Sequence, residues 1–259
     1  KTELLPPEKS FEIIHRIYHF SNPEQFLLPT SFFNVDVNLK DYLAPSSFKF
    51  ASKYNEVGLD YSCVMFAKRF SRTCDDEFVM DLLDNSSKII VSKHFSRLEK
   101  DTSLDILKEQ MNDLQGRIDR RLEINYKRSG ASGFIPWSLQ RRKKELEALE
   151  EKLSSTDCDL FEFAMYIYVA ANSLKELNDL RDYIKQTARR HQVTLDVLTG
   201  ATIQEKGLQC ILPFAQPALS DDKTLLGQPF YFATDEVAIL IPFTYQNNII
   251  QSGICYGIN

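Results

Sequence analysis

The chain has 259 residues, of which 43% are hydrophobic and 26% charged, so it can bury one large core or two modest ones. Its net charge of -5 argues against a general nucleic-acid-binding surface, and five widely spaced cysteines without a C-x-x-C pair indicate a reducing compartment rather than a disulfide scaffold or zinc knuckle. The longest apolar runs, such as Cys63–Ala67, fall far short of the roughly 20 residues that a membrane-spanning helix needs.

Residues 1–60 are predicted to hold one helix and an irregular segment. Apolar side chains recur at helical spacing in residues 8–20, which predicts a short amphipathic helix. Prolines interrupt residues 21–58, where only 34–38 has the pattern of a short strand.

Residues 61–200 have the pattern of an α+β core. Strands are predicted at the following ranges: Tyr61–Phe70, Ser87–Phe95, Asp159–Ala170 and Val193–Leu198. Helices are predicted to start after the capping pairs Asp75-Asp76 and Asn172-Ser173 and to run to Leu83 and His191. Without a long insertion at about 101–157, the order is βαββαβ, which predicts a ferredoxin-like antiparallel sheet with both helices on one face.

The insertion itself predicts an antiparallel helical hairpin with a narrow apolar seam. Its first arm spaces apolar residues by three or four positions from Leu104 to Leu122, and its second arm has leucines at 139, 146, 149 and 153, spaced by seven, three and four positions. Gly130 and Gly133 separate the arms. An arm of about 22 residues would extend roughly 33 Å.

Residues 201–259 are predicted to form a separate β-containing segment. Its clearest strand pattern is Val237–Phe243, and it ends in Gly253–Asn259.

Motifs for catalysis or metal binding are not found. Glu12, His15 and His19 share one face of the first predicted helix, but ordinary packing explains them better than a zinc site. None of the nine glycines begins the phosphate-binding pattern G-x-x-x-x-G-K-[ST], and no nucleophile motif is present. We therefore expect no catalytic, cofactor-binding or metal-binding residues, and no ATP hydrolysis by this chain.

The tip of the predicted hairpin is the sharper candidate site. Basic residues flank the loop Gly133–Trp137, which contains the single tryptophan and suits an anionic membrane surface or an acidic partner. The competing interpretation is that Phe134, Ile135 and Trp137 close the end of the seam while the basic side chains are simply solvated. The candidate docking residues are Arg120, Arg121, Lys127, Arg128, Phe134, Trp137, Arg141, Arg142, Lys143 and Lys144.

Three short motifs near the C-terminus resemble the sequence that leads into the motor of type IV secretion ATPases, the large assembly ATPases of conjugation systems. They are Leu212–Phe214, Ile241–Thr244 and Gly253–Asn259, and their amino-acid sequences are similar to those of Gram-positive members of the family. The upstream order of strands, charged hairpin and helix is similar too, so the resemblance covers nearly the whole chain.

The resemblance implies a non-catalytic N-terminal domain for oligomer assembly and for docking the motor to inner-membrane proteins of the secretion channel. It implies a cytoplasmic protein, peripheral at the inner face of the cell membrane, with no direct nucleic-acid binding by this domain. ATP and Mg²⁺ are expected only in the motor domain, which would follow Asn259 in a longer protein.

Two other functions stay open on the sequence alone. One is a ferredoxin-like small-ligand-binding or enzymatic domain with a coiled-coil insertion, and the other is a structural adaptor whose only functional part is the hairpin. Nucleotide titration separates the enzyme from the docking domain, and deletion of the hairpin tests the adaptor.

Overall fold

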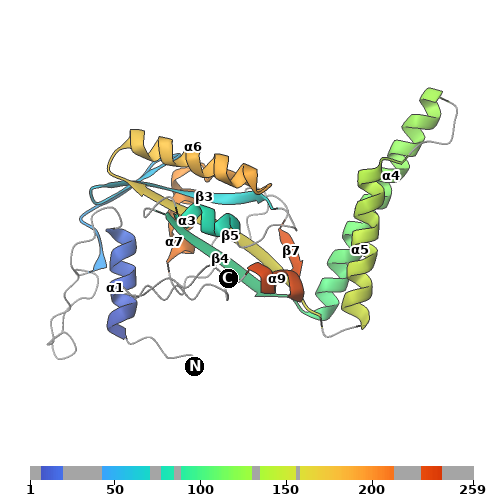
Figure 1. Ribbon diagram of the computed structural model, residues 1–259, viewed down its shortest axis with the longest axis horizontal. Helices are drawn as coiled ribbons and strands as arrows, with labels where there is room; N and C mark the ends of the chain where they lie inside the picture. The colour runs from blue at the N-terminus through green and yellow to red at the C-terminus, as the bar shows by residue number, and fades with distance from the viewer. Residues whose placement is uncertain are drawn as a thin grey trace, which may run out of the picture.

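The computed structural model describes residues 7–19, 43–70, 77–84, 89–129, 135–155, 158–212 and 229–240. Its centre is an antiparallel sheet of seven strands, with helices on both faces and a long helical hairpin that projects from one end (Figure 1). The strands are β1 (Phe48–Phe50), β2 (Asn55–Val57), β3 (Asp60–Arg69), β4 (Ile89–Arg97), β5 (Leu160–Ala171), β6 (Thr194–Val197) and β7 (Phe230–Ala233). The protein is therefore of the α+β class.

The strand order is β1-β2-β3-β5-β4, with β6 added beside β3 and β7 added beside β5. β2 pairs with the first residues of β3, whereas β6 pairs with its last residues, so both share one edge of that strand. β7 pairs with the first four residues of β5. The sheet thus takes strands from all three predicted segments of the chain.

The two central strands, β3 and β5, are buried on both faces. Alternate residues point to opposite sides, so Met65 and Ile167 join one apolar cluster while Phe66 and Tyr168 join the other. Because helices cover both faces, these strands read as nearly continuous apolar runs rather than as an alternating pattern.

One face of the sheet is covered by α3 (Glu77–Asp84) and α6 (Leu174–Arg190). Ser173 caps α6 by accepting a hydrogen bond from the Glu176 amide at 3.2 Å, which confirms the predicted start of this helix. His191 follows α6 and lies 2.8 Å from a carboxylate oxygen of Asp81, so the end of α6 is joined to α3.

The opposite face is covered by α1 (Pro7–Tyr18), which matches the predicted N-terminal helix, and by α7 (Ala201–Ile211), which the sequence analysis missed. A Cβ at Gly207 would lie 3.1 Å from Cβ of Val64, so the absence of a side chain lets α7 pack closely on β3. Gln204 is fully buried on α7, where its oxygen accepts from Asn55 Nδ2 and the Val64 amide, both at 3.1 Å.

One predicted strand is wrong over the part that the structure describes. Residues 237–240 of the predicted strand Val237–Phe243 belong to the helix α9 (Thr234–Leu240), and the strand of this region is β7, just before it. The acidic first turn explains the difference, because a Glu236 carboxylate oxygen accepts from the Ala233 amide at 2.9 Å and so favours a helix start.

Other differences concern the N-terminal part. β1 and β2 form a hairpin inside the stretch predicted to be irregular, closed by a hydrogen bond from the Ala51 amide to the Tyr54 carbonyl. The predicted strand at 34–38 and the capping pair Asp75-Asp76 lie outside the described residues.

The hairpin consists of α4 (Lys100–Ser129) and α5 (Trp137–Ser155), which confirms the two predicted arms. α4 is longer than expected, since its 30 residues at 1.5 Å each extend about 45 Å. α5 has only 19 residues, so the far end of α4 continues beyond α5 (Figure 1).

Candidate functional site

The two arms of the hairpin are held by one continuous apolar cluster. It buries Leu107, Leu114 and Ile118 of α4 against Leu146 and Leu149 of α5, all less than 10% exposed. The same cluster includes Leu160 and Ala233 at the base, so the seam is continuous with β5 and β7. Every seam residue between Leu104 and Leu153 that the spacing predicts belongs to this cluster or packs against it: Leu104, Leu107, Met111, Leu114, Ile118, Leu122, Leu139, Leu146, Leu149 and Leu153.

Polar contacts fix the base of the hairpin to the sheet and to α9. Lys152 Nζ lies 2.8 Å from an Asp235 carboxylate oxygen, and this hydrogen bond lowers the pKa of Asp235 and raises that of Lys152. The Asp159 amide donates to Thr234 Oγ1 at 3.0 Å, and Arg97 pairs with the Asp159 carboxylate at 2.9 Å. The hairpin therefore meets the body through β4, β5, β7 and α9 together.

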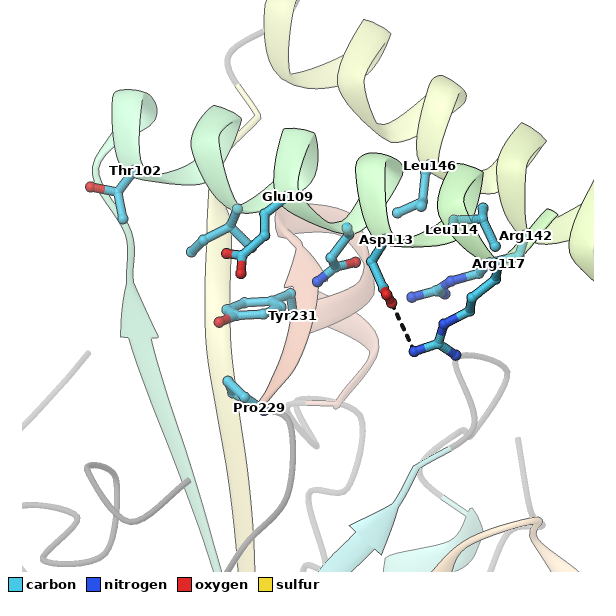
Figure 2. A pocket seen from close by; sticks show the side chains of 11 residues that line it. Thr102, Glu109, Asp113, Leu114, Arg117, Arg142, Leu146, Pro229 and Tyr231 are labelled. Carbon is cyan, nitrogen blue, oxygen red and sulfur yellow. Dashed lines mark ion pairs between the residues drawn. The ribbon is translucent and has the colours of Figure 1, made fainter. Parts of the chain in front are cut away.

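A pocket of about 900 Å³ lies where the hairpin joins the body. Figure 2 shows Glu109, Asp113 and Arg117 in a row along α4, with Tyr231 facing them from β7 and Arg142 approaching from α5. Asp113 and Arg117 form an ion pair at 2.7 Å. The pKa of Tyr231 is raised by burial first, and then by the nearby carboxylates of Glu162 and Glu109. The charged side chains that line the pocket are of both signs, and apolar side chains lie between them. The pocket therefore has no clear preference for an anion or a cation.

The predicted docking residues divide into two groups by their ion pairs. Four of the cations pair with a glutamate one helical turn away on the same helix. The nitrogen-to-oxygen distances are 2.6 Å for Lys127 with Glu123, 2.9 Å for Arg141 with Glu145, 3.8 Å for Arg142 with Glu145 and 4.0 Å for Lys143 with Glu147. The Lys127 ammonium lowers the pKa of Glu123 by donating a hydrogen bond to it.

The second group consists of exposed cations that take no part in these ion pairs. Arg120, Arg121 and Lys144 are exposed and form no ion pair with any residue that the structure describes. Phe134 and the side chain of Arg128 lie outside the described part of the chain.

Aromatic side chains at the same end of the hairpin face solvent. Trp137 is 66% exposed, and its ring lies 5.6 Å from the guanidinium carbon of Arg141, within reach of a cation–π interaction. Ile135 packs against the apolar seam, whereas Trp137 does not belong to it. Ile135 therefore closes the end of the apolar seam, whereas the exposed Trp137 ring is accessible to a partner.

Two exposed residues on α4, Ile124 and Tyr126, were missed by the sequence analysis. They are 47% and 66% exposed, so three of the seven exposed large apolar side chains among the described residues lie at this end of the hairpin. The sequence places Ile124 off the buried stripe, two positions after Leu122, but it places Tyr126 four positions after Leu122, in line with the seam. The exposure of Tyr126 therefore became visible only with the structure, in which α4 continues beyond α5. We define the hairpin end by its exposed apolar residues and unpaired cations, namely Ile124, Tyr126, Trp137, Arg120, Arg121 and Lys144.

Charge is distributed unevenly along the chain. Residues 117–147 contain nine Lys and Arg against four Asp and Glu, a net charge of +5. The whole chain has 31 basic and 36 acidic residues. The residues outside 117–147 therefore include 22 basic and 32 acidic side chains, a net charge of -10. The hairpin end is therefore a basic projection from an acidic body.

The histidines have structural partners. His15 and His19 stack with ring centroids 4.1 Å apart, and Glu12 pairs instead with Arg16 at 2.6 Å and Lys9 at 3.1 Å. His94 Nε2 lies 2.8 Å from the Cys210 carbonyl near the end of α7. Within the described ranges, no three His, Cys, Asp or Glu side chains gather closely enough to hold a metal ion.

No protein-family model matches the chain, and no curated protein matches it in sequence. Of the helices in the described ranges, none combines the length and the apolar character needed to cross a membrane.

Proposed function

We propose that this chain is the non-catalytic N-terminal assembly and docking domain of a type IV secretion ATPase that powers conjugative DNA transfer. The observation that carries the proposal is the basic hairpin that projects from an acidic α+β body, because such a shape suits a part that attaches a motor to fixed partners. The motifs at residues 212–214, 241–244 and 253–259 support the same family.

The core, in this proposal, is an elaborated ferredoxin-like sheet. The supporting observation is the neighbour order β6-β3-β5-β4, with all three pairs antiparallel. α3 and α6 lie on the same face, as that arrangement requires. β1, β2, β7 and α7 are then additions to the sandwich.

The partners in this proposal are inner-membrane proteins of the secretion channel and other copies of the full-length protein. The domain works at the cytoplasmic face of the membrane without contacting DNA. We expect no ATP hydrolysis by this chain, because it lacks the phosphate-binding pattern G-x-x-x-x-G-K-[ST] and the family resemblance assigns nucleotide and Mg²⁺ to the motor domain.

The pocket beside Tyr231 favours one alternative, a domain that binds a small ligand between the hairpin and β7. Side chains from α4, α5 and β7 converge there, as they do in many ligand sites. In that case Tyr231→Phe and Glu109→Gln would weaken ligand binding, whereas docking to membrane proteins would be unchanged.

The direct test is copurification of the channel proteins with the chain from detergent-solubilised membranes of conjugative donor cells. We expect capture by the intact chain and loss of capture when residues 101–157 are replaced by a short Gly-Ser linker. Equal capture by both forms would contradict docking through the hairpin. Nucleotide titration of the intact chain separates the alternatives, since the docking proposal expects no ATP turnover.

A further inference from the structure

Exposed aromatic residues and unpaired cations occur together at the hairpin end. Trp137 and Tyr126 are each 66% exposed, and Arg120, Arg121 and Lys144 have no ion pair among the described residues. We infer that the hairpin end binds an anionic lipid bilayer, with the hairpin tilted so that both aromatic rings reach the headgroups. The inference rests on the proposed function for placing the chain at a membrane, and it names the surface that the hairpin contacts.

The directions of these side chains favour a bilayer over a protein groove. Successive residues of a helix point about 100° apart, so Arg120 and Arg121 diverge and Tyr126, six positions after Arg120, points in a third direction. A groove that receives a helix contacts one stripe of residues at i, i+3, i+4 and i+7. Cations and aromatics that surround the helix instead suit contact with a broad surface.

The proportions of the hairpin call for a tilted contact, because α5 has 19 residues and stops well short of the far end of α4, which has 30. Because α4 continues beyond α5, its exposed residues Ile124 and Tyr126 lie on the most distant part of the hairpin that the structure describes (Figure 1). Tyrosine and tryptophan have an apolar ring and a polar group, which suits them to the boundary between headgroups and acyl chains.

Electrostatics then orients the chain. The +5 charge of residues 117–147 is attracted to an anionic surface, while the remaining -10 is repelled by it. The length of α4, about 45 Å, is several times the screening length of about 8 Å at physiological ionic strength. A chain bound by the hairpin end therefore holds most of its acidic body outside the repulsive field.

The single tryptophan allows a direct test, because all tryptophan emission of the chain comes from Trp137. The intact chain is titrated with vesicles of equimolar phosphatidylglycerol and phosphatidylcholine, and with vesicles of phosphatidylcholine alone. We expect a blue shift of the emission with the anionic vesicles, quenching by brominated acyl chains, and reversal by high salt. Arg120→Ala/Arg121→Ala/Lys144→Ala should weaken partition on the order of 100-fold, on the usual contribution of each basic residue.

The matched control removes three exposed cations of α6 instead, Lys175→Ala/Arg189→Ala/Arg190→Ala, and should bind anionic vesicles as the unaltered chain does. Unchanged Trp137 emission with anionic vesicles would overturn the inference, as would an equal shift with both vesicle types. A shift with polyglutamate but not with vesicles would point to an acidic protein and also overturn it. The vesicle titration contains no channel protein, so its results are independent of the copurification that tests the proposed function.

Discussion

At the scale of single residues, the body depends on a few buried contacts between α7 and the sheet. Leu198 and Val64 leave no room for a side chain at Gly207, since a Cβ there would lie 2.5 Å from Leu198 Cδ1. Leu198 is fully buried and the nearer Val64 atom is its Cβ, so neither can move aside easily. The closeness of α7 to β3 is thus set by one glycine.

Gly207→Ala should therefore destabilise the protein despite the better helix propensity of alanine. Overpacking costs about 1–3 kcal/mol, which exceeds the roughly 1 kcal/mol that alanine gains over glycine in a helix. Gly116 is the matched control, because nothing lies within 4 Å of a Cβ at this position of α4. Urea unfolding should show a loss for Gly207→Ala and a gain of up to about 1 kcal/mol for Gly116→Ala. Equal gains at both sites would show that α7 does not pack on β3 this closely.

Gln204 is the second contact of this kind. Its side chain also donates to the Leu198 carbonyl at 2.6 Å, so it bonds to three segments of the body. Gln204→Leu should lower the free energy of unfolding by about 2–5 kcal/mol, because buried donors and acceptors lose their partners. The exposed Gln140→Leu is the comparison and should change stability by less than about 0.5 kcal/mol. Similar small values for both variants would argue against the buried network.

The cysteines differ in burial, which predicts their reactivity. Burial raises the pKa of the Cys63 thiol to about 12, so at pH 8 only about one molecule in ten thousand has the thiolate. Cys210 is also buried, whereas Cys158 is half-exposed. Iodoacetamide labelling of the folded chain followed by peptide mass spectrometry should modify Cys158 well before Cys63 or Cys210. Rapid labelling of Cys63 would contradict its burial on β3, on the face of the sheet that α6 covers.

At the scale of elements, the hairpin has its own apolar seam and only its base is shared with the body. The sequence could predict both arms because each repeats apolar residues at helical spacing over several turns. It could not reveal α7, since Gly207 lies inside this helix, nor α9, whose apolar residues look like a strand when the cap at Thr234–Glu236 is ignored.

The candidate site could be predicted in part for the same reason. The basic residues and Trp137 are visible from the sequence, but which cations are paired depends on neighbours one turn away. Ile124 and Tyr126 become notable only when α4 is known to continue past the start of α5.

Leu146→Ala tests whether the hairpin opens as a local unit. Leu146 is 1% exposed in the seam, so its truncation should cost about 2–5 kcal/mol. Amide hydrogen exchange should accelerate in α4 and α5 while amides of β3 and β5 remain protected. Ala148→Ser, on the exposed side of α5, should leave exchange unchanged. Acceleration across the whole sheet would mean that hairpin and body unfold together.

At the scale of the whole molecule, the body and the hairpin have different roles in the proposed function. The α+β body has helices packed on both faces of its sheet, and the hairpin carries a basic end about 45 Å along α4. The ion pair of Lys152 with Asp235 and the pairing of β5 with β7 join the hairpin base to α9. In the proposed parent, α9 precedes the segment that enters the motor, so contacts at the hairpin and the position of the motor are connected through a short path.

The most direct measurement is the frequency of conjugative DNA transfer from donor cells that produce an excess of this chain. If the proposed function is correct, the excess chain should occupy the docking sites and lower transfer, and replacement of residues 101–157 by a linker should abolish this inhibition. Transfer that stays unchanged at a high level of folded chain would contradict the account, as would equal inhibition by the form that lacks the hairpin.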